Sequence, residues 1–331
     1  MNITVFGAGA WGSALAIGLA NHHDLVLWGR DADTVGQMAL NRENTRYLPG
    51  HRLPDSLRVT SDFTAAVAHA NPDGLLIAAS PVAGLRELAQ RLQLHAASHL
   101  IWLCKGLEYG THLLPHQVIH QVMGEHFPAG ALSGPSFAQE VAAGMPCALT
   151  LASTNAALRE RAAEGLHGGN LRVYSSDDVI GVEVGGAVKN ILAIATGVAD
   201  GLQLGLNARA ALITRGLAEI TRFGMALGGR METFMGLSGI GDLILTCTGD
   251  LSRNRRVGLS LARGTPLATI EQELGHVAEG VRCAQAVRAL ARQYAVDMPI
   301  TEAVADALFD GLSVQQLVDR LLARDQREET R

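Results

Sequence analysis

The sequence contains few cysteines and no strong excess of charge of either sign. Its four cysteines, Cys104, Cys147, Cys247 and Cys283, are far apart and form no C-x-x-C pair. This spacing predicts reduced thiols in a cytoplasmic protein and argues against a disulfide framework. The formal net charge is −5. The overall charge therefore gives no support to binding of nucleic acid or of a membrane surface. A local basic site for a small anion is compatible with this charge.

The sequence also lacks long apolar runs. No uninterrupted run reaches the ~18–20 residues that a membrane-spanning helix needs, because Lys189, Asn190 and Asp200 interrupt the longest candidate. The opening "MNITVFGAGAWG" enters an expected strand at once, so we expect no cleavable signal before the fold. There is no repeat with a period of about 20 to 50 residues and no G-x-S-x-G motif for a nucleophile. The sequence therefore predicts a cytoplasmic protein without stable membrane insertion.

The composition of the 331 residues, 48% hydrophobic and 18% charged, is that of a globular protein. A chain of this length predicts about two domains. In the first half, short apolar runs alternate with helical patterns, which predicts a parallel sheet with helices on both faces. The expected strands are ITVF, LVLW, GLLIAAS, HLIWLC, GALSG and CALTLAS, and the expected helices cover 12–21, 32–42, 81–93, 113–124 and 155–165.

The second half of the sequence has a different pattern. From about residue 178 it is helical, and the segments GLQLGLN, GLSGIGD and ARGTP predict turns between the helices. We therefore expect an α/β domain at residues 1–180 and an all-α domain at residues 181–331. The expected helices of the second domain cover 179–200, 208–227, 253–262, 282–294, 300–310 and 313–322.

The segment "GAGAWG" places Gly7, Gly9 and Gly12 in the spacing G-x-G-x-x-G between an expected strand and an expected helix. The first glycine permits a tight turn, the second lets a pyrophosphate approach the backbone, and the third lets the helix pack on the strand. The free N–H groups of the helix N-terminus favour phosphate. The motif predicts a Rossmann-like dinucleotide-binding domain, and the alternative is a glycine-rich turn without a ligand.

The second expected strand ends in "LVLWGRD", with Arg30 before Asp31. An acidic residue near this strand end favours NAD, whereas a basic residue accommodates the 2′-phosphate of NADP. Because arginine comes first, we expect NADP(H) as the preferred cofactor, with NAD(H) as the alternative. Arg30 would also be compatible with solvent exposure and with equal use of both cofactors.

The helix expected at 179–200 contains a lysine and an asparagine, Lys189 and Asn190, among apolar residues. Lysine is rarely buried without a partner, so its position here indicates proton transfer in a site. Gly185 and Gly186 precede it, and we expect the two glycines to flatten the helix so that a ring or substrate can approach. The alternative is a lysine that snorkels from a partly exposed helix.

A second polar segment, residues 236–258, supports the functional interpretation of Lys189. It contains Asp242 in an apolar setting, followed by "SRNRR", in which Ser252 is a good N-cap. Arg253 and Asn254 in the first helical turn predict a site for a phosphate monoester, although such charged runs are commonly solvated. In the first half, Lys105 follows an expected strand, as do Ser136 and Phe137, where open α/β sheets bind ligands.

Three histidines occur at four-residue intervals, His112, His116 and His120. Pro115 suits the first turn of a helix, so we expect His112 to lie outside it. Two remaining histidines without a carboxylate or thiolate at ligand spacing do not make a zinc site. We expect solvent-facing imidazoles and no metal.

The sequence resembles the bacterial NAD(P)-dependent sn-glycerol-3-phosphate dehydrogenases, also called dihydroxyacetone-phosphate reductases. The resemblance covers essentially the whole chain and is carried, in the family's order, by GAGAWG, YLPG, CKGLE, SGPSFAQEV, EVGGAVKNILAIATG, GIGDLILTCT, SRNRRVG and VAEGV. It implies a Rossmann-like domain followed by an all-α domain, with the active site between them. The implied reaction is reversible hydride transfer between NAD(P)H and dihydroxyacetone phosphate, giving sn-glycerol 3-phosphate for phospholipid synthesis. A homodimer is a further family-level expectation.

The resemblance also implies roles for individual residues. Lys189 is the expected general acid/base. The expected substrate-binding residues are Lys105, Gly134, Ser136, Lys189, Asp242, Ser252, Arg253 and Asn254. The expected cofactor-binding residues, including those of the glycine-rich loop, are Gly7, Gly9, Ala10, Trp11, Gly12, Arg30, Lys105, Ala138, Arg253, Val277 and Glu279.

Two alternatives remain open at this stage. One is a related reductase of the same architecture, such as a 3-hydroxyacid or 6-phosphogluconate dehydrogenase. The other is a regulatory protein that senses NADP(H) without reducing anything, although a sensor needs neither Lys189 nor the anion site at Arg253.

Overall fold

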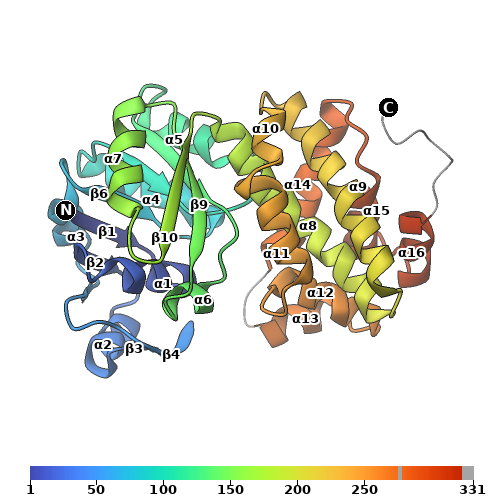
Figure 1. Cartoon of the computed structure of the whole chain (residues 1–331), viewed down its shortest axis with the longest axis horizontal. Coiled ribbons are helices and arrows are strands. Elements are labelled where there is room, and N and C mark those ends of the chain that lie inside the picture. Colours follow the sequence, from blue (N-terminus) through green and yellow to red (C-terminus); the bar gives the residue numbers. More distant parts are fainter. Residues whose placement is uncertain (275–277, 323–331) are drawn as a thin grey trace. The chain divides into compact units, whose positions relative to one another are not determined.

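The six apolar runs expected to be strands all lie in one eight-stranded sheet, with the strand order β10-β9-β8-β7-β6-β1-β2-β5 (Figure 1). The computed structural model describes residues 1–274 and 278–322. It divides into a first unit, Met1–Glu183, which contains this sheet, and a second unit that begins at Val184. The strands of the sheet are β1 (Asn2–Phe6), β2 (Asp24–Trp28), β5 (Arg58–Thr60), β6 (Leu75–Ala78), β7 (Leu100–Trp102), β8 (Ala129–Ser133), β9 (Cys147–Ala152) and β10 (Leu171–Ser176).

Helices cover both faces of the sheet, as the alternation predicts (Figure 1). Because successive strand residues point to opposite faces, Ile3 and Val5 pack in a core with α1 and α7, whereas Phe6 packs in a second core with α3, α4 and α5. The helices of this unit are α1 (Ala10–Leu19), α2 (Ala32–Asn41), α3 (Phe63–Ala70), η1 (Val82–Gly84), α4 (Leu85–Leu94), α5 (Pro115–Met123), α6 (Ala138–Ala142), α7 (Ala156–Leu166) and the first turns of α8 (Val179–Gly201).

The expectation of a parallel sheet is wrong for one pair of strands. β9 runs antiparallel to β8, and β10 pairs parallel to β9. The apolar pattern of a buried strand is the same in either direction, so the sequence could not distinguish the two. β10 itself was not expected, because as an edge strand it alternates buried residues with the exposed Arg172 and Tyr174.

A small hairpin follows α2 and lies outside the main sheet. Its strands, β3 (Glu43–Asn44) and β4 (Leu48–Arg52), pair antiparallel. The side chain of Asn44 is buried, and its Nδ2 donates to the carbonyl oxygen of Ala8 at 2.9 Å and to Oγ of Ser13 at 2.8 Å. These two hydrogen bonds attach the hairpin to the glycine-rich loop and to α1.

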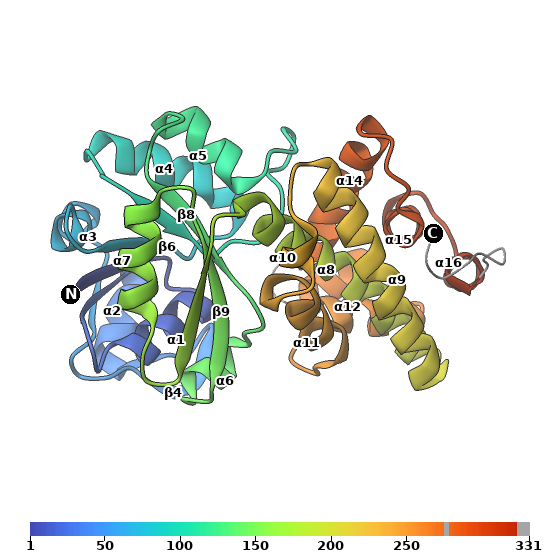
Figure 2. The same cartoon turned by 45° about the horizontal axis from the view of Figure 1, so that its top comes forward.

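The described part of the second unit is entirely helical (Figure 2). Among the described residues, α8 is the one helix long and apolar enough to cross a membrane, and 94% of its most apolar window is buried inside the protein. A buried core helix passes the same test. After α8 come α9 (Gly205–Ala226), α10 (Met231–Phe234), a π-helix η2 (Leu237–Gly241), α11 (Asp242–Thr248), α12 (Arg253–Ala262), α13 (Leu267–Leu274), α14 (Glu279–Gln293), α15 (Pro299–Phe309) and α16 (Val314–Leu322).

A buried carboxylate joins two of these helices. Glu219 of α9 is 1% exposed and accepts hydrogen bonds from the backbone N–H groups of Ile300 at 2.6 Å and Thr301 at 3.1 Å, and from Oγ1 of Thr301. These groups belong to the first turn of α15, whose N–H groups have no partner within the helix. Burial raises the pKa of Glu219 although these hydrogen bonds oppose the shift. Glu219 therefore acts as a remote N-cap for α15.

A buried histidine makes the stability of the first unit depend on pH. His99 is 1% exposed, and its Nε2 accepts a hydrogen bond from the N–H of Leu76 at 3.1 Å. Burial, assisted by the charge of Arg161, lowers the pKa of His99 from 6.5 to about 4. As the pH falls from 6.5 to about 4, His99 binds a proton in the unfolded chain but not in the folded chain. We therefore expect the free energy of unfolding to fall by about 3 kcal/mol over this range.

Replacing His99 by glutamine removes the titrating group but keeps an oxygen that can accept from Leu76. We expect His99→Gln to flatten the loss of stability between pH 6.5 and about 4, measured by urea unfolding at a series of pH values. His126→Gln removes an exposed histidine and should leave the slope unchanged. An unaltered acid slope in His99→Gln would contradict the assignment.

Candidate functional site

The glycine-rich loop has the geometry of a phosphate cradle. Gly7 has φ +126°, and a Cβ there would lie 2.8 Å from the carbonyl carbon of Ala79. A Cβ at Gly9, in contrast, would meet no described atom within 4 Å. Gly9 is also the N-cap of α1, and no described side chain caps this helix end. The open space beside free N–H groups therefore fits the pyrophosphate of a dinucleotide.

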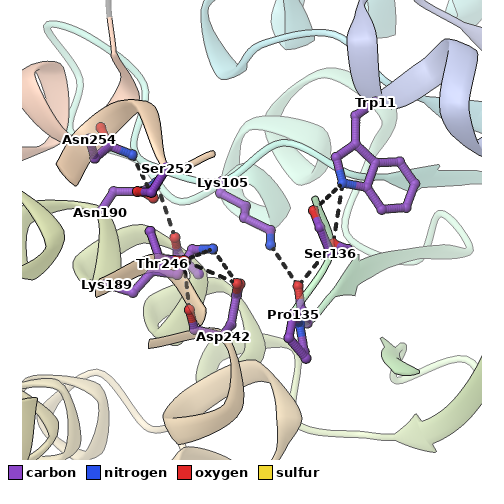
Figure 3. A network of polar contacts seen from close by, with 12 residues as sticks. Trp11, Lys105, Pro135, Ser136, Lys189, Asn190, Asp242, Thr246, Ser252 and Asn254 are labelled. Carbon is purple, nitrogen blue, oxygen red and sulfur yellow. Dashed lines mark hydrogen bonds and ion pairs between the residues drawn. The ribbon is translucent and has the colours of Figure 1, made fainter. Parts of the chain in front are cut away.

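Four predicted site residues of the first unit lie together (Figure 3). Nζ of Lys105 donates to the carbonyl oxygen of Gly134 at 3.1 Å, and Oγ of Ser136 donates to the same oxygen at 3.0 Å. Nε1 of Trp11, in α1, lies 3.2 Å from Oγ of Ser136 and 3.1 Å from its carbonyl oxygen. The loops after β7 and β8 are thus linked to the start of α1. Ala138, the first residue of α6, packs against the same core as Trp11.

The loop that carries Lys105 is held by an ion pair that was not predicted from the sequence. Nε and one terminal nitrogen of Arg86, in α4, donate to the two carboxylate oxygens of Glu108, each at 2.8 Å. Oγ1 of Thr111 donates to the same carboxylate at 2.6 Å. The hydrogen bond from Arg86 lowers the pKa of Glu108, and burial opposes this shift. Two-point binding of a carboxylate by arginine fixes orientation as well as charge, so this pair restrains the loop three residues after Lys105.

Lys189 lies in the centre of a buried polar cluster of the second unit (Figure 3). Its ammonium group donates to Oδ1 of Asp242 and, at 3.0 Å, to Oγ1 of Thr246. Lys189 is 6% exposed, Asp242 1% and Thr246 5%. Since α8 supplies the lysine and α11 the other two groups, the cluster joins the two helices. The lysine does not snorkel into solvent.

Thr246 was not among the residues predicted from the sequence, although its spacing from Asp242 indicates it. It follows Asp242 by one helical turn, so both side chains lie on the same face of α11. Its hydroxyl also donates to the backbone oxygen of Asp242 at 2.6 Å. A second missed signal is that, of the 27 basic residues in the chain, only Lys105 and Lys189 are lysines. Both lysines are predicted site residues.

The expectation that Gly185 leaves room for a ligand is wrong. A Cβ at Gly185 would overlap the backbone oxygen of Ser238, in the π-helix η2. The missing side chain therefore lets η2 pack directly against α8. Because α11 follows η2 without a break, this close contact helps to hold Asp242 against Lys189.

Two asparagines connect three helices around Lys189. Nδ2 of Asn254, in α12, donates to Oδ1 of Asn190 at 2.9 Å, and the backbone N–H of Gly280 donates to Oδ1 of Asn254 at 3.0 Å. Gly280 follows Glu279, the first residue of α14, which is half-buried. The structure thus brings Asn254 and Glu279 into the same neighbourhood of the second unit. Val277, also predicted to bind the cofactor, lies outside the described residues.

The run "SRNRR" forms the start of α12, as expected. Its arginines differ in their exposure and in their ion pairs. Oγ of Ser252 accepts from the backbone N–H of Arg255 at 3.2 Å and caps the helix. Arg255 pairs with Asp200 at 2.7 Å, so its charge is neutralised within the protein. Arg253 is exposed at the first helical position. Of these two arginines, Arg253 has the accessible position that an anion site requires.

The end of β2 carries two of the residues on which the cofactor prediction depends. Arg30 is exposed, and its only described ion pair is with Glu87 at 4.0 Å. Oδ1 of Asp31 accepts from the backbone N–H of Thr34 at 2.7 Å and caps α2. The hydrogen bond from the Thr34 side chain is the largest cause of the lowered pKa of Asp31, and this backbone hydrogen bond is the second.

The expectation that all three histidines face solvent is wrong for His116. Its Nδ1 lies 2.5 Å from Oε2 of Glu183, and its backbone N–H donates to Oε1 at 2.8 Å. Burial alone would lower the pKa of His116, but the charge and hydrogen bond of Glu183 raise it. His112 precedes α5, as expected. Among the described residues, no group of three or more histidine, cysteine or acidic side chains could hold a metal ion.

Comparisons with known proteins agree over both units. The family model of the NAD-dependent glycerol-3-phosphate dehydrogenase N-terminus matches residues 2–159, and that of the C-terminus matches residues 178–319. The chain is 68% identical over 329 residues to the glycerol-3-phosphate dehydrogenase [NAD(P)+] of Herminiimonas arsenicoxydans, covering 99% of both chains. It is 67% identical over 331 residues to that of Paucimonas lemoignei, covering 100% of this chain and 99% of the relative.

A solved structure of a glycerol-3-phosphate dehydrogenase is similar to this chain over nearly its whole length. The crystal structure of glycerol-3-phosphate dehydrogenase from Coxiella burnetii matches with a TM-score of 0.92 and 43% identity, over 97% of this chain and 98% of that chain. D-mandelate dehydrogenase, at 14% identity and a TM-score of 0.61, shares only the fold. The matches to both family models and to full-length relatives establish that the chain belongs to the NAD(P)-dependent glycerol-3-phosphate dehydrogenase family.

Proposed function

We propose that the protein catalyses the reversible reduction of dihydroxyacetone phosphate to sn-glycerol 3-phosphate with NAD(P)H, in the cytoplasm, and so supplies glycerophospholipid synthesis. The observation that carries the proposal is the buried ammonium group of Lys189 between Asp242 and Thr246. A ketone needs a proton on its oxygen as it is reduced, and a desolvated, oriented lysine suits this role. The names of the close relatives support the same reaction.

Residues of the first unit would supply most of the contacts with the cofactor. The open space at Gly9 and the free N–H groups of α1 fit the pyrophosphate, with Gly7, Ala10, Trp11 and Gly12 around it. We assign further cofactor contacts to Lys105, Ala138, Arg253 and Glu279. When bound, the nicotinamide supplies the hydride, and the protein supplies orientation and the proton.

Lys189 would act as the general acid in reduction and as the general base in oxidation. In reduction, its Nζ gives a proton to the oxygen on C2, and the lysine regains a proton from solvent before the next turnover. Asp242 and Thr246 hold Nζ in position by accepting its hydrogen bonds. Fixing the donor in this way removes orientational freedom before the reaction begins.

The phosphate and hydroxyl groups of the substrate would be bound by the remaining predicted residues. Arg253 is an exposed cation at the N-terminus of α12, where N–H groups also favour an anion. We assign the phosphate to Arg253, with Ser252 and Asn254 shaping this helix end. Lys105, Gly134 and Ser136 are assigned to the remainder of the substrate.

We propose NADP(H) as the preferred cofactor, since Arg30 is exposed at the end of β2 while Asp31 caps its own helix. Arg30→Ala should weaken the binding of NADPH by about tenfold, the effect of one charged hydrogen bond, and that of NADH much less. Fluorescence titration with both cofactors measures the difference. Equal losses for both would remove Arg30 from this role.

The reaction itself is tested by following the absorbance of reduced nicotinamide with a panel of carbonyl compounds. We expect oxidation of NADPH with dihydroxyacetone phosphate and much slower oxidation with unphosphorylated dihydroxyacetone. Turnover of a 3-oxoacid instead would indicate a related reductase. Binding of NADPH without turnover of any panel member would indicate a sensor.

A further inference from the structure

The hairpin β3–β4 forms part of the surroundings of the glycine-rich loop. Asn44 binds Ala8, between Gly7 and Gly9, and Ser13 of α1 through its Nδ2. Oδ1 of Asn44 accepts from the backbone N–H of Tyr47 at 3.2 Å, which closes the turn of the hairpin. Because Asn44 is 1% exposed, these bonds are shielded from water. The turn 45–47 is therefore fixed beside the loop that fits the pyrophosphate.

The turn presents an arginine to solvent. Arg46 is exposed, and its guanidinium carbon lies 5.1 Å from the centre of the Tyr47 ring. A cation over an aromatic face is favourable, so the ring restrains the direction of the guanidinium. Among the described residues, no carboxylate forms an ion pair with Arg46, unlike Arg52 of the same hairpin, which pairs with Asp55 at 3.0 Å.

Arg30 reaches the same neighbourhood from the main sheet. β1 and β2 pair with Phe6 opposite Trp28, and the N–H of Gly7 donates to the carbonyl oxygen of Trp28 at 2.9 Å. A Cβ on Gly29 would lie 3.2 Å from Cβ of Ala8. The backbone of Gly29, directly before Arg30, therefore lies beside Ala8, the residue whose carbonyl oxygen Asn44 binds.

The acidic groups around the two arginines leave their charges largely available. The hydrogen bonds from Thr34 lower the pKa of Asp31 most, and the charges of both arginines lower it further. Oδ1 of Asp31 caps α2. Glu87, at 4.0 Å from Arg30, is exposed and forms a weak pair. Asp33 lies in the first turn of α2. Two exposed arginines from separate segments thus lie near the same strand end.

We propose that Arg46, together with Arg30, binds the 2′-phosphate on the adenosine ribose of NADP(H). This inference rests on the proposed dinucleotide-dependent function and adds a second specificity-determining residue from a separate element. Guanidinium groups bind phosphate oxygens in pairs, so two of them can enclose a dianion that NAD(H) lacks. Neither arginine takes part in the chemical step.

The test uses nucleotide fragments that differ only in the phosphate. Binding of 2′,5′-ADP and of 5′-AMP to the full chain is measured by calorimetry for the wild type, Arg46→Ala and Arg52→Ala. We expect Arg46→Ala to weaken 2′,5′-ADP by about tenfold or more, the effect of losing a charged hydrogen bond, and to leave 5′-AMP within about twofold. Arg52→Ala, the control on the same hairpin, should change neither. Arg46→Glu should weaken 2′,5′-ADP further.

The outcomes separate this inference from the proposed function. Equal losses of both fragments in Arg46→Ala would mean that Arg46 stacks on adenine, and no loss would mean that it is not in the site; either result overturns the inference. In both cases the wild type would still bind NADH and NADPH and reduce dihydroxyacetone phosphate. Failure of the wild type to bind either dinucleotide would instead overturn the proposed function.

Discussion

Lys189→Ala should lower the turnover of dihydroxyacetone phosphate by about two to four powers of ten, the usual contribution of a general acid. Cofactor affinity should change little, because the cofactor's phosphates are assigned to other residues. Alanine keeps the helix but leaves a space where the ammonium group was. A small primary amine such as methylamine should enter this space and restore part of the rate with a dependence on pH. Steady-state kinetics with and without the amine measure both effects.

The stability of this variant must be measured at the same time. Removing one partner of a buried ion pair commonly costs about 3 to 5 kcal/mol, because the other charge remains without compensation. The double variant Lys189→Met with Asp242→Asn removes both charges, and we expect it to fold and to be inactive. Thr196→Val changes another buried polar residue of α8 and should leave turnover near normal. Near-normal turnover in Lys189→Ala would remove this residue from the chemistry.

The elements best predicted from the sequence are those whose start and end are determined by their own residues. The helix expected at 253–262 has these bounds in the structure, since Ser252 caps its start and "ARGTP" ends it. Segment 236–242 was expected to be a turn because of its glycines, yet residues 237–241 form a π-helix. Its glycines serve packing: Gly239 lies against Phe234, and Ser238 lies against Gly185. Such contacts depend on the tertiary structure, which local preference does not encode.

In the candidate site, too, the residue types could be predicted from the sequence, whereas their tertiary contacts could not. A lysine and an aspartate in apolar surroundings were recognisable because burial of each without a partner costs free energy. The direct hydrogen bond between these two side chains, 53 positions apart in the sequence, is seen in the structure alone. Arg253 was predicted for the anion site from its place in the first helical turn, but the sequence did not show what Arg255, two positions later, contacts. Its ion pairs with Asp200 and Asp250 show that Arg255 is a structural residue.

Arg253→Ala should lower kcat/KM for dihydroxyacetone phosphate by about two to three powers of ten, because a bidentate charged contact with phosphate is lost. The loss should appear mainly in KM if the phosphate contact is equally strong in the ground state and the transition state, and in kcat if it serves to position C2. Arg253 is exposed at the helix start, so we expect the fold to remain intact. Kinetics with saturating NADPH separate the two parameters.

The decisive comparison for Arg253 is with unphosphorylated dihydroxyacetone, which is expected to react slowly in the wild type. If Arg253 binds phosphate, its removal should change this slow rate by less than about twofold, as for a surface substitution. Arg263→Ala removes an exposed arginine from the other end of α12 and should affect neither substrate. Equal losses on both substrates would contradict the phosphate role and leave Arg253 only its assigned contact with the cofactor, which a parallel titration with NADPH would measure. A loss confined to the phosphorylated substrate would mean that α12 selects a phosphorylated triose, while Lys189, on a different helix, acts on its carbonyl oxygen.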